Sequence, residues 1–223
     1  MLDDAWADLD VGNYMGARSK ARRAATDPSL RPEALHLLGR ISLQRNTPAQ
    51  ALTLFEKSLA LGYDTPDLYY DIGLSHEHLG NTAKRTAAFL EVLDRDSGYD
   101  IDLPTHLSED LLVGIAEELL GELPAKITEK LGNVPILVDD RPSRDLVADG
   151  FDPRALGLFE GIPFPDEISA GPALNRILLF RVNIDAFTFS ESDAVEQVRI
   201  TLLHEIAHFF GMNEDEVTAL GLG

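Results

Sequence analysis

Apolar residues recur at helical spacing through the first 98 residues, in segments separated by short polar turns. Residues three and four apart lie on one face of a helix, so this spacing indicates amphipathic helices. The segments come in pairs, and the pattern predicts helices over residues 2–10 with 13–25, 34–44 with 48–61, and 67–79 with 82–94. We therefore expect residues 1–98 to form an all-α domain.

These paired segments repeat along the chain with an offset of 34 residues, which relates Gly39 to Gly73 and Phe55 to Phe89. A glycine on one helix lets its partner helix approach closely, and an aromatic side chain can fill the space between them. The same offset relates residues of the turns between helices, where a left-handed backbone is needed: Gly12, Asn46 and Gly80. The sequence therefore predicts successive copies of one helix pair.

A 34-residue period of helix pairs is similar to that of tetratricopeptide repeats. The resemblance implies a stack of helix pairs with a groove that binds a peptide or a partner protein. An equally open interpretation is a helical support that packs on the rest of the chain. Three copies are close to the minimum for a stable stack.

The pattern changes in the second half of the chain. Residues 95–106 break the helical spacing and carry glycine, proline and aspartate, which is typical of a domain boundary. Beyond them, the pattern predicts a helix over 109–121, a short helix from Pro124 to Gly132, strands over 134–138 and 176–184, and a long C-terminal helix. Residues 139–165 are rich in loop formers around a short apolar segment, 156–159. We expect residues 107–223 to form a small α+β domain, so that the whole chain is of the α+β class.

The long C-terminal helix carries the motif H-E-x-x-H at His204-Glu205-Ile206-Ala207-His208. Residues four apart share a helix face, so both imidazoles can bind one metal ion. Glu205 lies beside them, where it would contact a metal-bound water rather than the metal. Zinc hydrolases use three protein ligands and leave a fourth position for water. The motif predicts peptide-bond hydrolysis by zinc-activated water, with Glu205 as the general base.

The third zinc ligand has to come from outside the motif. The chain has no cysteine, so the ligand must be His, Asp or Glu. Gly211 is placed to end the helix and turn the chain back beneath it. Glu214 is then the first carboxylate that can reach the ion, and we predict that it is the third ligand. Asp215 remains the alternative.

The net charge of the chain limits which molecules it is expected to bind. The chain has 19 Lys and Arg against 38 Asp and Glu, a net charge of −19, and residues 99–223 alone hold 8 against 24. Such an acidic half is a poor partner for nucleic acid, and its negative potential favours a divalent cation and basic substrate segments. The sequence has no apolar run of membrane-spanning length, no basic-then-apolar leader and no cysteine. We expect a cytoplasmic protein without membrane or nucleic-acid partners.

The second half also resembles a known family, the zincin-like minimal metalloprotease domains. The resemblance is carried by these segments: Leu123-Pro124, residues 133–138, 140–143 and 156–163, Arg176 to Arg181, and Thr201 to Gly211. It implies a small α+β zincin fold and a motif in which His204, Glu205, His208 and Gly211 match directly. Glu214 stands where the family usually has Asp or Ser, and Phe209 stands where many members have a further histidine.

Two functions from different classes are consistent with these observations. The first is a zinc-dependent endopeptidase whose substrate is recruited by the helical repeats and lies along the edge of the 176–184 strand. Arg176 and Arg181 are candidates for stabilising the oxyanion or, alternatively, ion-pair partners. The second function is a non-catalytic protein-binding scaffold with a degenerate metal site. Glu205 distinguishes them, because a scaffold needs no carboxylate between two metal ligands.

Overall fold

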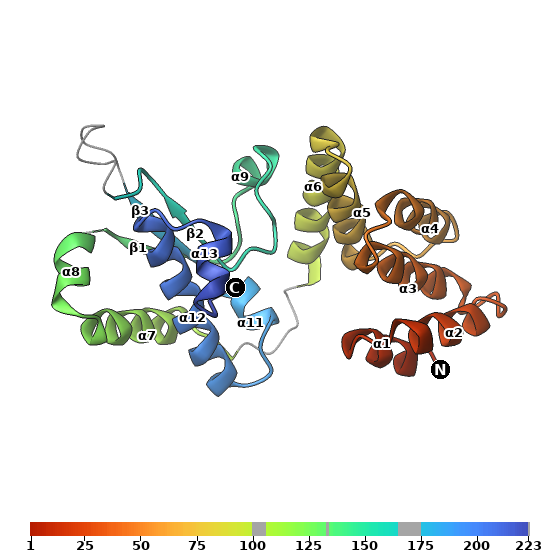
Figure 1. The fold of residues 1–223 in the computed structure, drawn as a ribbon, viewed down its shortest axis with the longest axis horizontal. Helices are drawn as coiled ribbons and strands as arrows, with labels where there is room; N and C mark the ends of the chain where they lie inside the picture. Colours follow the sequence, from red (N-terminus) through yellow and green to blue (C-terminus); the bar gives the residue numbers. More distant parts are fainter. Residues whose placement is uncertain (100–105, 133, 165–174, 223) are drawn as a thin grey trace. The chain divides into compact units, whose positions relative to one another are not determined.

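The computed structural model describes residues 1–99, 106–132, 134–164 and 175–222 (Figure 1). The chain forms two compact units: Met1–Ile101 with Ser143–Pro153, and Asp102–Pro142 with Arg154–Gly223. The first unit therefore contains a segment from within residues 107–223, which the sequence assigned as a whole to the second domain. The core of the predicted boundary, residues 100–105, lies outside the described residues, as do Asn133 and Pro165.

The first unit is built from pairs of antiparallel helices. Its helices are α1 (Asp3–Asp10), α2 (Tyr14–Ala24), α3 (Arg31–Gln44), α4 (Pro48–Ala60), α5 (Pro66–His78) and α6 (Thr82–Tyr99). Helix α1 packs on α2, α3 on α4, and α5 on α6, which are the pairs predicted from the sequence. The three turn residues predicted to need a left-handed backbone all have positive φ: Gly12 at 73°, Asn46 at 55° and Gly80 at 69°. This left-handed backbone at successive 34-residue intervals confirms the predicted helical repetition.

The helix pairs α3–α4 and α5–α6 share one glycine–phenylalanine contact, which recurs 34 residues later in the chain. A Cβ atom added to Gly39 would lie 2.2 Å from Cε1 of Phe55, and one added to Gly73 would lie 2.3 Å from Cε1 of Phe89. Phe55 is fully buried and Phe89 is nearly so. The phenyl ring therefore occupies the space that any larger residue on the facing helix would need.

Replacing Phe55 by alanine is expected to destabilise the first unit by about 3–5 kcal/mol, because it removes a fully buried ring. Gly39→Ala alone should also destabilise this unit, because its methyl group would overlap the ring. When Phe55 is alanine, the methyl group of Gly39→Ala has room. In that background, Gly39→Ala should leave the free energy of unfolding unchanged or raise it. Urea unfolding followed by the fluorescence of Trp6, the chain's one tryptophan, measures these changes in this unit. Additive effects of the two substitutions would contradict the described packing.

The segment Ser143–Pro153 completes the last hydrophobic cluster of the first unit. It contains α9 (Arg144–Ala148), whose Val147 is fully buried in a cluster with Phe89 and Leu93. Just beyond α9, the guanidinium of Arg85 donates a hydrogen bond to the carbonyl oxygen of Gly150 at 2.6 Å. Apolar burial and this hydrogen bond together hold the segment on α5 and α6.

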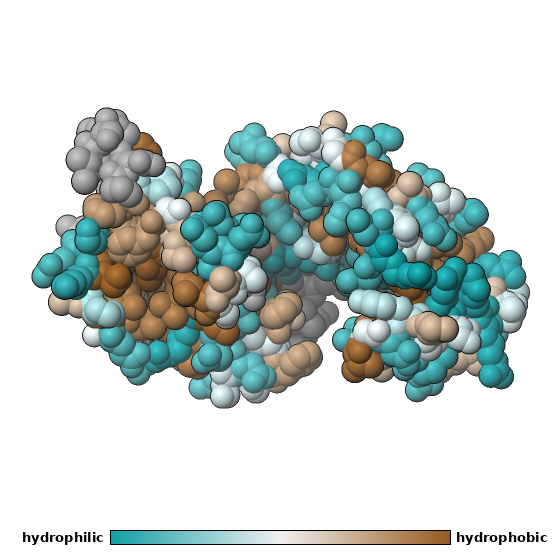
Figure 2. Space-filling view, in the orientation of Figure 1, coloured by the Kyte–Doolittle hydropathy of each residue, from teal (hydrophilic) through white to brown (hydrophobic). Residues whose placement is uncertain are grey.

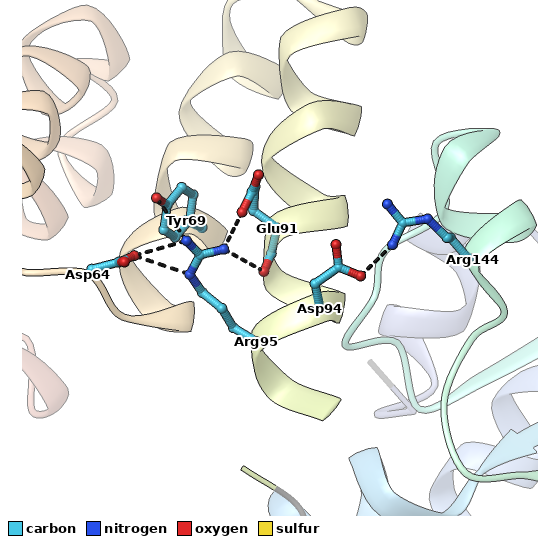
Figure 3. Close-up of polar contacts among 6 residues, drawn as sticks. All are labelled: Asp64, Tyr69, Glu91, Asp94, Arg95 and Arg144. Atoms are coloured by element: carbon cyan, nitrogen blue, oxygen red, sulfur yellow. Dashed lines mark hydrogen bonds and ion pairs between the residues drawn. The ribbon is translucent and has the colours of Figure 1, made fainter. Parts of the chain in front are cut away.

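Two side-chain contacts add to this attachment. The hydroxyl of Tyr70 on α5 donates to a carboxylate oxygen of Asp152 at 2.7 Å. Arg144 on α9 forms an ion pair with Asp94 on α6, as Figure 3 shows. Both partners of that ion pair are more than half exposed, so it adds little stability. The burial of Val147 and the hydrogen bonds to Gly150 and Asp152 therefore matter more to the attachment than this ion pair does.

The second unit is a small three-stranded sheet covered by helices. Its strands are β1 (Ile136–Asp139), β2 (Gly157–Glu160) and β3 (Arg176–Phe180), and its helices are α7 (Glu109–Glu122), α8 (Ala125–Leu131), α11 (Arg181–Ala186), α12 (Glu191–Phe209) and α13 (Glu214–Ala219). The strand order is β1-β3-β2, with β1 parallel and β2 antiparallel to β3. Helix α12 packs against α7 and against strands β2 and β3. The chain is therefore α+β, as predicted.

The predicted strand over 176–184 is wrong in its second half. Strand β3 ends at Phe180, and residues from Arg181 onwards form α11. Near the end of α11, the carboxylate of Asp185 accepts backbone N–H groups of His106 and Leu107 at 2.8 and 2.9 Å, which anchors this helix to the segment before α7. The apolar segment at 156–159 proves to be the core of β2, an edge strand. None of the helices in the described part of the chain is long and apolar enough to cross a membrane.

Candidate metal centre

Helix α12 carries the motif, and local signals fix its two ends. The hydroxyl of Ser190 accepts the backbone N–H of Asp193 and caps the N-terminus. One helix face is buried in the core of the second unit and holds the predicted apolar residues Ala194, Val198, Leu202, Ile206 and Phe209. After Phe209, Gly211 adopts φ of +82° and turns the chain. The helix thus holds both histidines against a fixed core.

Helix α13 brings the carboxylate of Glu214 back toward the motif. Asn213 and Glu216 form a capping box, in which each side chain accepts the other residue's backbone N–H. This box fixes the first turn of α13, where Glu214 lies. Because its carboxylate accepts the N–H of Asn213, Glu216 has a structural role.

The side chains of His204, His208 and Glu214 meet at one point. Their ligand atoms all lie within 4.8 Å of one another. The Nε2 atoms of the two histidines are 2.9 Å apart, and carboxylate oxygens of Glu214 lie 3.7 Å from His204 Nε2 and 3.3 Å from His208 Nε2. The side chain of Glu214 is 76% exposed and each imidazole is 22% exposed, so the group faces solvent. Among the described residues, Asp215 does not belong to this group.

Backbone carbonyl groups fix the tautomer of both imidazoles. Nδ1 of His204 lies 2.8 Å from the carbonyl oxygen of Leu222, and Nδ1 of His208 lies 2.9 Å from that of Met212. A carbonyl oxygen can only accept, so each Nδ1 must carry the proton. In the neutral imidazoles both Nε2 atoms then present lone pairs toward each other and toward a carboxylate. A proton on one Nε2 or a metal ion between the three groups relieves the repulsion among these lone pairs, and hydrogen bonds from Nδ1 to carbonyl groups are the outer-shell pattern of metal-bound histidines.

Glu205 lies beside this group but faces the sheet. It is 6% exposed, and its Oε2 accepts the backbone N–H of Phe159 on β2 at 2.6 Å. Burial raises the pKa of the Glu205 carboxyl, and the nearby carboxylate of Glu214 raises it further. His204, the Phe159 N–H and His208 act in the opposite direction and lower this pKa without cancelling the rise. A carboxyl group with a raised pKa is better matched to accepting a proton near neutral pH.

Strand β2 approaches α12 closely because residue 157 is glycine. A Cβ atom there would lie 2.8 Å from Oε1 of Glu205 and 2.9 Å from Cγ2 of Thr201. The sequence alone did not indicate that Gly157 and the Phe159 N–H contribute to this site. The available signal was a glycine inside an apolar run, which often marks a close approach of backbone to another group.

The two arginines considered for the oxyanion are ion-paired. Arg176 donates to Glu160 at 2.6 Å, and Arg181 pairs with Asp140 and donates to the carbonyl oxygen of Leu107. These contacts support the alternative interpretation of both residues as structural partners. Phe209 packs against other aromatic rings beneath the site, namely Phe159, Phe164 and Phe210.

The fold and the site together define a class: a small α+β domain with an H-E-x-x-H helix packed on a mixed sheet. The comparison with known families agrees. Residues 131–223 match the family model described as zincin-like metallopeptidase, so the chain has a zincin-like C-terminal domain. A search of curated proteins gives no match. The family match includes α9, which packs in the first unit.

Proposed function

We propose that the protein is a zinc-dependent endopeptidase whose substrate is recruited by the helical repeats. The observation that carries this proposal is the convergence of His204, His208 and Glu214 next to the buried carboxylate of Glu205. The family match to zincin-like metallopeptidases supports the same class of reaction.

The donor atoms fit zinc. Two imidazole nitrogens and one carboxylate are a known ligand set of catalytic zinc sites, which keep one further position open. The proton on each Nδ1 leaves each Nε2 free to bind, and the exposure of Glu214 leaves the site open to solvent. When bound, zinc supplies a Lewis acid that polarises a peptide carbonyl and acidifies water.

Glu205 supplies the proton transfer in this proposal. Its carboxylate would accept a proton from the attacking water and later deliver it to the leaving amine. The hydrogen bond from the Phe159 N–H holds Oε2 in place, and Oε1 lies close to the backbone at Gly157. Burial beneath β2 keeps bulk water away from the carboxylate, which strengthens its interactions with neighbouring charges.

The structure corrects the expected position of the substrate. Strand β3 is the central strand and pairs with β1 and β2, so it has no free edge. Strand β2 is an edge strand, and it is the strand that contacts Glu205. We therefore place the extended backbone of the substrate along the outer edge of β2, held by main-chain hydrogen bonds.

Zinc content and chelator-sensitive hydrolysis test this function in the full chain. We expect about one zinc per chain by mass spectrometry of the metal, and cleavage of fluorescein-labelled casein that a chelator stops and added zinc restores. A protein that binds zinc without cleaving casein or a diverse peptide library would instead be the non-catalytic scaffold. A protein that binds no zinc at micromolar concentration would refute the metal site itself.

A further inference from the structure

The surface of the first unit carries a basic hollow that the proposed reaction does not use. Two adjoining hollows, about 350 and 640 Å³ in volume, are both lined by Arg18, Arg22 and Arg45. Arg18 and Arg22 project from α2, and Arg45 follows the end of α3. Figure 2 shows the mostly hydrophilic surface of the helical unit to which these helices contribute.

These three guanidinium groups are unpaired. In the described part of the chain, none of them lies within 4 Å of a carboxylate oxygen. Some other cations of this unit do have such partners, as Arg40 has Asp71 and Arg85 has Glu77. Residues 1–98 hold 14 Asp and Glu against 11 Lys and Arg, so acidic residues are present in this unit to serve as partners. Three neighbouring arginines without one form a local positive potential in an acidic protein.

The hollows also have apolar walls. Leu38, Ile41 and Leu54 line the smaller hollow, and Met15, which is 86% exposed, lines the larger one. Neither hollow is lined by an aspartate or a glutamate. A ligand that fits must therefore carry several anionic groups and apolar groups close together. Exposed methionine suits such a ligand, because its flexible side chain adapts to different apolar partners.

We infer that this hollow, which we call the arginine hollow, binds an acidic peptide segment in which Asp or Glu side chains alternate with apolar ones. Guanidinium groups bind carboxylates through paired, charge-assisted hydrogen bonds. Three arginines around one concave site match a short segment better than they match a nucleic-acid backbone, which requires an extended basic track. The inference rests on the recruitment by repeats proposed above, and it assigns the substrate a chemical class: a protein with an exposed acidic segment that also carries apolar side chains.

Fluorescence anisotropy of a labelled twelve-residue peptide of alternating Glu, Leu and Asp tests the inference on the full chain. We expect saturable binding that weakens with salt and is lost when the peptide's acids are replaced by Gln and Asn. Replacing Arg18, Arg22 and Arg45 together by Gln should raise the Kd about tenfold or more. Arg23→Gln, on the same helix but outside both hollows, should change the Kd less than about twofold.

Several outcomes would overturn the inference. The inference fails if the peptide with Gln and Asn binds as tightly as the acidic peptide. It also fails if replacing Arg18, Arg22 and Arg45 together leaves the Kd unchanged. Tighter binding of a single-stranded oligonucleotide at the same arginines would assign the hollow to nucleic acid. Trp6 fluorescence and circular dichroism establish that each variant is folded. Since binding is measured without turnover and repeated after zinc removal, a failure here is distinguishable from a failure of the proposed hydrolysis.

Discussion

Glu205→Gln is expected to reduce kcat/KM for peptide hydrolysis by about 10²- to 10⁴-fold, the usual contribution of a general base. Glutamine has nearly the same shape, and its carbonyl oxygen can still accept the Phe159 N–H. It cannot take a proton from water at neutral pH. The zinc content should stay at the wild-type level, because Glu205 is not part of the group of metal-binding atoms.

Hydrolysis of a fluorogenic peptide and metal analysis, done on the same preparation, measure both effects. Glu196→Gln is the matched control, because Glu196 lies on the same helix and is exposed. It should leave kcat/KM within about twofold, as is usual for surface substitutions. Activity of the Glu205→Gln variant within tenfold of the wild type would exclude Glu205 as the general base.

Glu214→Ala is expected to weaken zinc binding by at least about 100-fold. Even the outer-shell partners of a ligand commonly contribute 10- to 100-fold to metal affinity, and Glu214 is assigned to the metal directly. Its carboxylate oxygens lie 3.3 and 3.7 Å from the two Nε2 atoms, close enough for one ion to join all three groups. Competition with a chromophoric chelator measures the affinity.

Asp215→Ala is the matched control for Glu214→Ala. Both residues lie in the first turn of α13, so each substitution removes a similar favourable interaction with the helix dipole. The capping box of Asn213 and Glu216 is intact in both variants. We expect Asp215→Ala to change zinc affinity less than threefold. If Asp215→Ala weakens zinc binding and Glu214→Ala does not, Asp215 is the third ligand. If neither substitution changes zinc affinity, the third ligand is another residue.

The elements that were predictable from the sequence are those fixed by local signals. Helix α12 has a serine cap, a regular apolar face and a terminating glycine, and all three lie within or beside the helix itself. The helix pairs of the first unit were predictable because Phe55 and Gly39 recur 34 residues later as Phe89 and Gly73. A sequence pattern that recurs at a fixed interval indicates which helices pack together, even though the contacting residues are far apart in the sequence.

The features that the sequence did not reveal depend on distant residues. Residues 181–186 form a helix that is anchored through Asp185 to backbone groups of His106 and Leu107, which lie more than 70 positions away. The edge position of β2 depends on its pairing with β3, and the orientation of Glu205 depends on β2. At the candidate metal centre, by contrast, the sequence predicted both histidines and Glu214. The turn at Gly211 explains how Glu214 reaches them.

The attachment of α9 to the first unit constrains the order in which the chain can fold during translation. When residues 1–101 have emerged from the ribosome, Val147 has not yet been added to the chain. The cluster around Phe89 and Leu93 is therefore still exposed to water. Synthesis proceeds at about 5–20 residues per second, so closure follows a few seconds later. When Val147 emerges, β1 has already emerged but β3 has not. Strand β1 therefore cannot yet pair, because β3 is its neighbour in the sheet. The helical unit is thus completed while the sheet beside the metal centre is still being made.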